Sequence, residues 1–158
     1  MLELFPGYCI DTNALIDLWR RFYPPDIFSS LWKEIENIIS QGKLIAPREV
    51  FDELGKQDDE LYKWAKRNKQ MYKNLDREQM KQVCNILKQF KELIDTNKET
   101  PDADPFVIAL AKNKGWTVIT SEKPANLGGH PKIPDVCKNY NIKCIPLIEF
   151  FREQKWEF

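Results

Sequence analysis

Three acidic residues that are far apart in the chain each stand beside an apolar segment. Asp11 follows residues 8–10, Asp104 precedes a long apolar run, and Glu122 comes just after residues 118–120. Carboxylate oxygens are the ligands that Mg2+ and Mn2+ prefer. If the three segments are neighbours in one core, their acids can share a divalent cation and support metal-assisted hydrolysis.

A parallel sheet would bring these acids together, because the carboxyl ends of parallel strands gather along one edge, where ligands bind. Four short apolar segments are typical of buried strands, at about residues 8–10, 44–46, 116–120 and 144–146. Helical patterns lie between them. We therefore predict an α/β fold, a three-layer α/β/α sandwich with a parallel sheet.

The expected helices cover about residues 13–21, 26–41, 48–54, 104–114 and 147–154. Residues 58–95 predict a helical insertion after the second strand, made of two helices broken near Asn74. Asp76 and Gln79 have the spacing of a capping box at the second of these helices. Residues 122–134, rich in Gly and Pro, predict a loop.

The composition indicates one compact domain over residues 1–158, with 42% hydrophobic content. Twenty-four Lys and Arg balance twenty-four Asp and Glu. The chain therefore has no overall cationic field, and nucleic-acid binding would need a local basic patch or a metal.

The four cysteines form no C-x-x-C pair, which argues against a zinc ribbon and a disulfide scaffold. We expect buried thiols in a reducing cytosol. Residues 1–7 lack the features of a signal peptide, and no apolar run reaches transmembrane length. These features predict a cytoplasmic protein that does not enter a membrane.

Each acid also has a purely structural explanation. Asp11 and Asp104 suit helix N-caps, and Glu53 and Glu122 suit solvated surface positions. The functional interpretation of Asp11 gains weight because a charge directly after a buried strand needs compensation. Asp102 adds a like charge beside Asp104, which calls for a nearby cation.

Four acidic motifs resemble, in order and spacing, those of PIN-domain nucleases, the fold of VapC-type ribonuclease toxins. They are Ile-Asp-Thr-Asn at 10–13, Val-Phe-Asp-Glu-Leu at 50–54, Asp-Ala-Asp-Pro-Phe-Val-Ile-Ala at 102–109, and Val-Ile-Thr-Ser-Glu at 118–122. Residues 132–137 and 147–151 further resemble one PIN-like subfamily of unknown function. Each motif is short, but their ordered combination is fairly specific and spans most of the chain.

The resemblance implies an acidic metal site formed by four residues: Asp11, Glu53, Asp104 and Glu122. It implies three residues that support them by hydrogen bonds: Thr12, Asn13 and Thr120. The family usually has Asp where Glu122 stands, and the longer side chain can reach an ion through a water. Glu53 is preferred to Glu49 because it directly precedes Leu54, and no role follows for Asp135.

The chemistry that fits is hydrolysis of an RNA phosphodiester by water activated on one or two Mg2+ or Mn2+ ions. No Ser or Cys nucleophile is indicated, and His130 lies in a Gly/Pro-rich loop. Five basic residues are candidate RNA contacts by their proximity to the motifs: Arg20, Arg21, Arg48, Lys123 and Lys132.

By the same resemblance the chain would be the toxin of a type II toxin-antitoxin pair, with RNA, a cognate antitoxin and a second copy of itself as partners. Two alternatives remain open. One is a non-catalytic PIN-like module that binds RNA or protein. The other is an aspartyl-phosphate enzyme or receiver domain, although Asn13 stands where such a phosphatase needs a second Asp, and only Lys123 could be the receiver's lysine.

Overall fold

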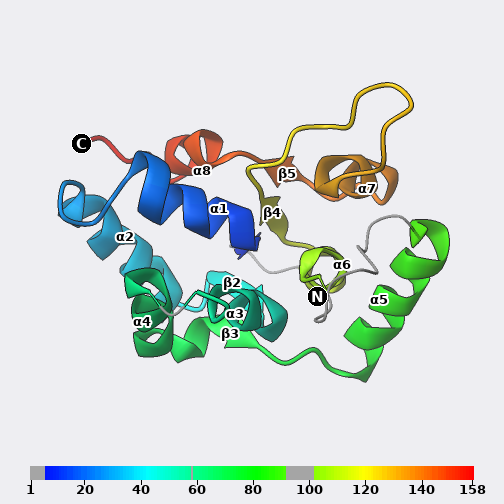
Figure 1. Ribbon diagram of the computed structural model, residues 1–158, viewed down its shortest axis with the longest axis horizontal. Coiled ribbons are helices and arrows are strands. Elements are labelled where there is room, and N and C mark those ends of the chain that lie inside the picture. The colour runs from blue at the N-terminus through cyan, green and yellow to red at the C-terminus, as the bar shows by residue number, and fades with distance from the viewer. Residues whose placement is uncertain (1–5, 58, 92–101) are drawn as a thin grey trace.

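The computed structural model describes residues 6–57, 59–91 and 102–158 (Figure 1). Five parallel strands form one sheet in the order β3-β2-β1-β4-β5. The strands are β1 (Tyr8–Ile10), β2 (Leu44–Pro47), β3 (Tyr72–Lys73), β4 (Thr117–Ile119) and β5 (Cys144–Ile145). The predicted α/β class and parallel sheet are confirmed.

Eight α-helices lie between or after these strands within the described residues. They are α1 (Thr12–Ile16), α2 (Ser29–Ser40), α3 (Arg48–Leu54), α4 (Glu60–Arg67), α5 (Arg77–Gln89), α6 (Asp104–Lys114), α7 (Ile133–Asn139) and α8 (Leu147–Glu153). A π-helical segment (Asp17–Phe22) continues α1, and a 3-10 turn (Lys69–Met71) precedes β3.

The strand order reverses direction between β1 and β4. The chain runs outward from β1 to β2 and β3, then returns to place β4 on the other side of β1. Right-handed crossovers then put the connecting helices of the two halves on opposite faces of the sheet, consistent with a three-layer sandwich. In open α/β sheets the carboxyl edge at such a switch point is where ligands bind.

The central elements are almost entirely buried, as their apolar sequences predict. All four residues of β2 and all three of β4 are buried. Helix α6 begins with a proline in its first turn and ends at Gly115, whose φ of 70° is the left-handed conformation of a helix C-cap. This helix contacts β1, β2 and β4, so it packs directly on the sheet.

Two elements differ from the sequence prediction. The insertion contains the two expected helices, α4 and α5, but the break between them is the edge strand β3, which pairs Ala46 with Tyr72. The expected capping box of α5 is present, while residues 58 and 92–95 lie outside the described residues. Helix α7 was also not predicted, because it follows a Gly/Pro-rich stretch whose composition indicates a loop.

The described part of the chain contains no helix long and apolar enough to span a membrane. Cys9 and Cys137 are buried and Cys144 is partly buried, as expected for core thiols. Cys84 is exposed, so the expectation of burial was wrong there, because it lies on the solvent side of α5.

Candidate functional site

Asp11 directly follows β1 and is only 1% exposed. Its Oδ1 accepts a hydrogen bond of 2.7 Å from the Ala14 backbone N–H, so it is the N-cap of α1. Its Oδ2 accepts a hydrogen bond from the Thr120 hydroxyl. Helix capping therefore accounts for Oδ1 of Asp11, while Oδ2 is bound to Thr120, directly after β4.

Thr120 connects the switch point to Glu122. It is buried, and its Oγ1 donates to Asp11 and accepts from the Glu122 backbone N–H at 3.1 Å. The Glu122 side chain then turns to α7, where its Oε2 accepts from the Ile133 N–H at 3.0 Å. The carboxyl ends of β1 and β4 are thus joined by side-chain hydrogen bonds.

Glu53 and Asp104 come from two helices at the same edge. Glu53 lies near the end of α3, and its Oε1 accepts a 2.7 Å hydrogen bond from the Ala103 N–H. Asp104 is the first residue of α6, and the cap position belongs to Ala103. Asp104 is therefore not the N-cap that its sequence position suggests.

The four acids act on one another electrostatically. Burial, as the largest cause, and the negative charges of Glu122, Asp11 and Glu53 together raise the pKa of Asp104 to about 8. Burial also raises the pKa of Asp11 to about 7, against the opposing hydrogen bonds from Thr120 and Ala14. The structure therefore brings the four sequence-predicted acids into one electronegative region.

The carboxylates do not converge as ready-made ligands of a single ion. Across residues 6–57, 59–91 and 102–158, no group of three His, Cys, Asp or Glu side chains is arranged to hold a metal directly. Glu53 and Glu122 each bind a backbone N–H through one oxygen, at Ala103 and Ile133. Direct ligation by three side chains would require them to move.

The three predicted supporting residues have different environments. Thr120 is part of the network described above. Thr12 is 6% exposed, and its buried hydroxyl has no hydrogen-bond partner among the described residues. Asn13 is exposed. A buried, unpaired hydroxyl next to Asp11 is an unusual feature, because such a group normally finds a partner.

A family model described as "Domain of unknown function (DUF4411)" matches residues 8–158. The chain belongs to the DUF4411 family. The match includes all four acidic motifs and every strand of the sheet. The comparison with curated proteins gave no match.

The candidate RNA contacts of this DUF4411 chain fall into two groups. Each arginine has an acidic partner: Arg20 pairs with Asp59, Arg21 with Asp17 at 3.3 Å, and Arg48 with Asp52 at 4.0 Å. Lys123 and Lys132 are exposed on the segment between β4 and α7, close in sequence to Glu122. Exposed ion pairs are worth little, so these arginines remain able to exchange partners.

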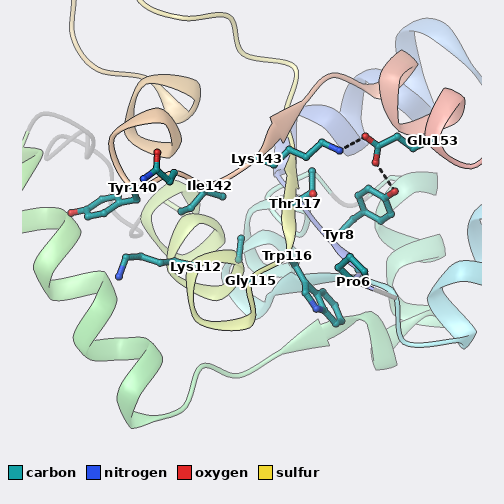
Figure 2. A pocket seen from close by; sticks show the side chains of 13 residues that line it. Pro6, Tyr8, Lys112, Gly115, Trp116, Thr117, Tyr140, Ile142, Lys143 and Glu153 are labelled. Carbon is teal, nitrogen blue, oxygen red and sulfur yellow. Dashed lines mark hydrogen bonds and ion pairs between the residues drawn. The ribbon is translucent and has the colours of Figure 1, made fainter. Parts of the chain in front are cut away.

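A hollow of about 400 Å³ lies at the opposite edge of the sheet, beside the starts of β1 and β4 (Figure 2). Its charged groups are bound to other side chains. Glu153 accepts from Lys143 Nζ at 2.6 Å and from the Tyr8 hydroxyl at 2.8 Å, and Lys112 donates to Gln82 at 2.8 Å. We assign this hollow no part in the chemistry of the acids.

Three further acids have no predicted role, and the nearest is Asp102, which is 8% exposed and adds to the raised pKa of Asp104. Glu49 is on the same helix as Glu53, but none of the site acids contributes to the shift of its pKa, which is raised mainly by burial. Asp135 lies in the first turn of α7, and its Oδ2 accepts from the backbone N–H groups of Ala125 and Lys132. The sequence signal for these hydrogen bonds is weak: an Asp that directly follows Pro134 at the start of a helix.

Proposed function

We propose that this DUF4411 chain is a metal-dependent endoribonuclease of the PIN-like type, with Mg2+ or Mn2+ as its cofactor. The observation that carries the proposal is the mutual electrostatic effect of Asp11, Glu53, Asp104 and Glu122 at the switch point of the sheet. The negative charges of Glu53 and Glu122, which come from distant motifs, help to raise the pKa of both Asp11 and Asp104 there. A divalent cation would remove that repulsion.

The donor set fits a hard cation that keeps part of its water shell. Mg2+ is usually bound by one or two carboxylates and retains several waters. Asp11 and Asp104, the two acids whose pKa burial raises most, would hold the ion, and Glu53 and Glu122 would bind through water with their second oxygens. The unpaired hydroxyl of Thr12 offers one more oxygen beside Asp11.

The bound ion would supply an activated water and neutralise charge on the phosphate. The chain's own residues prepare the site for it. Thr120 fixes Asp11 by donating to Oδ2, which keeps that carboxylate directed to the carboxyl edge. Lys123 and Lys132 would attract the RNA backbone to an otherwise acidic region, since phosphate contacts by lysine dominate such binding.

Degradation of a single-stranded RNA by purified protein, with and without Mn2+, tests this function. We expect cleavage that requires the metal and is lost in Asp104→Asn, while Asp26→Asn, a change at an exposed acid in the turn before α2, cleaves normally. Cleavage by Asp104→Asn at the wild-type rate would refute the proposal. So would the absence of saturable Mn2+ binding in titration calorimetry.

The biological part of the proposal rests on the PIN-like resemblance. The chain would act in the cytoplasm as the toxin of a type II toxin-antitoxin pair, bound by a cognate antitoxin and paired with a second copy of itself. Induced expression should then stop bacterial growth, and Asp104→Asn should relieve the arrest. Equal growth inhibition by both proteins would count against a toxic nuclease.

A second candidate is a non-catalytic PIN-like module that binds RNA or protein. It is favoured by one observation, the lack of three converging direct ligands within the described residues. RNA binding in EDTA without cleavage in Mn2+ would support this module. The aspartyl-phosphate alternative is disfavoured because Asp11 is buried and both its oxygens accept hydrogen bonds.

A further inference from the structure

The segment between β4 and α7 is held by two carboxylates that bind neighbouring backbone groups. Glu122 Oε2 accepts from the Ile133 N–H at 3.0 Å, and Asp135 Oδ2 accepts from the Lys132 N–H at 2.8 Å. Asp135 Oδ2 also accepts from the Ala125 N–H at 2.9 Å. The two acids therefore hold consecutive peptide groups at the start of α7.

Burial does little to fix the shape of this segment. Residues 126–130 are all exposed, and Leu127 at the tip is fully exposed. Gly128 has a φ of 80°, a conformation that costs glycine little. With so few apolar contacts, the polar bonds at the two ends determine where the segment lies.

The bond from Ala125 to Asp135 goes beyond ordinary helix capping. A cap binds N–H groups within its own first turn, as Asp76 does in α5 by accepting from Gln79 at 2.8 Å. Asp135 accepts a hydrogen bond from the N–H of Lys132 at the start of its own helix. It also accepts one from the N–H of Ala125, ten positions earlier in the chain. The bond thereby joins the two ends of the segment and closes residues 125–135 into a hydrogen-bonded loop, called the ring below.

We propose that Asp135 is a positioning residue for Glu122. By closing the ring, it keeps the Ile133 N–H at the Glu122 carboxylate, and so keeps Glu122 beside Asp11 and Asp104. The inference rests on the proposed function, because its consequence is tighter binding of a divalent cation by the acidic site. Residues that orient a ligand in this way typically change metal affinity by about 10–100-fold when removed.

Titration calorimetry with Mn2+ on the full chain tests this inference. Asp135→Ala should weaken Mn2+ binding about tenfold. Asp135→Asn should retain near wild-type affinity, because a single amide oxygen can accept both N–H bonds. Asp76→Ala is the matched control, since it removes a helix-capping carboxylate far from the site in sequence and should leave Mn2+ affinity unchanged.

A double variant separates positioning from a general loss of structure. In a Glu122→Ala background, Asp135→Ala should change Mn2+ affinity by less than about twofold, because residues that act through one another are not additive. A full further loss in that background, or wild-type affinity in Asp135→Ala alone, would overturn the inference.

Amide hydrogen exchange gives a reading that does not depend on the metal. The Ile133 N–H should exchange at least about tenfold faster in Asp135→Ala than in wild type or Asp135→Asn. If wild type fails to bind Mn2+, the proposed function fails while this measurement still decides the positioning role. Unchanged protection of Ile133 in Asp135→Ala would refute that role in either case.

Discussion

Replacing Asp104 with Asn should make the metal-free protein more stable near neutral pH and should flatten its pH dependence. The pKa of Asp104 rises from 3.8 to about 8 on folding, because burial and four neighbouring acids disfavour its ionised form. The folded state therefore keeps a proton that the unfolded state has released. Such a carboxyl stabilises the fold fully below about pH 4, and this contribution is lost as pH rises through about 8.

The expected size follows from that difference in bound protons. Each carboxyl that is protonated only when folded lowers the free energy of unfolding by about 1.4 kcal/mol per pH unit. Between about pH 5 and pH 7, the difference between Asp104→Asn and wild type should thus widen by about 3 kcal/mol. Solvent screening at the partly exposed Asp104 reduces this to about 2 kcal/mol.

Urea unfolding in EDTA, followed by tryptophan fluorescence near pH 5, 6 and 7, measures this difference. Asp26→Asn serves as the control, because an exposed acid should shift all three values equally. The reasoning is refuted if the difference between Asp104→Asn and wild type stays constant over this range. Asp104 would then titrate as an ordinary surface carboxyl.

Three further predictions concern neighbouring groups. Mn2+ should raise the urea midpoint of wild type but not of Asp104→Asn. Its affinity should fall as pH drops below about 8, where Asp104 takes up a proton, and further below about 7, where Asp11 does so; calorimetry showing pH-independent affinity would contradict this. Thr120→Val should lower the free energy of unfolding in the same urea assay by about 1–3 kcal/mol, because it leaves the buried Asp11 oxygen and the Glu122 N–H without a partner. A loss below about 0.5 kcal/mol would show that neither hydrogen bond contributes to stability. Tyr72→Phe removes a buried hydroxyl that has no partner in the described structure, so stability should stay level or rise by up to about 1 kcal/mol; a clear loss would mean that the hydroxyl is bound in solution.

The sequence predicted the parts of the fold that carry their own apolar signal. β1, β2, β4 and β5 were expected because strands covered by helices on both faces must be short and apolar. β3 was missed because its two residues, half-buried Tyr72 and exposed Lys73, have no such pattern. An edge strand of this kind is defined by the pairing of its backbone with β2.

The same distinction applies to the candidate site. The gathering of Asp11, Asp104 and Glu122 could be expected, because parallel strands end at one edge whatever their separation in sequence, whereas Glu53 was named only through the PIN-like resemblance. Their hydrogen-bond partners could not, since the donors at Ala103 and Ile133 are backbone N–H groups that any residue supplies. The start of α7 was missed for this reason: long-range bonds from Glu122 and Asp135 fix it, and its Gly/Pro-rich approach predicts only a loop.

The hydrogen bond between Thr120 and Asp11 joins residues 109 positions apart. During synthesis, the first half of the chain can build β1, β2 and β3 while Asp11 still lacks this partner. The acidic region is completed only after β4 and α7 have left the ribosome. A chain that ends before α7 therefore lacks part of the acidic region, and any activity of this region requires both halves of the sheet.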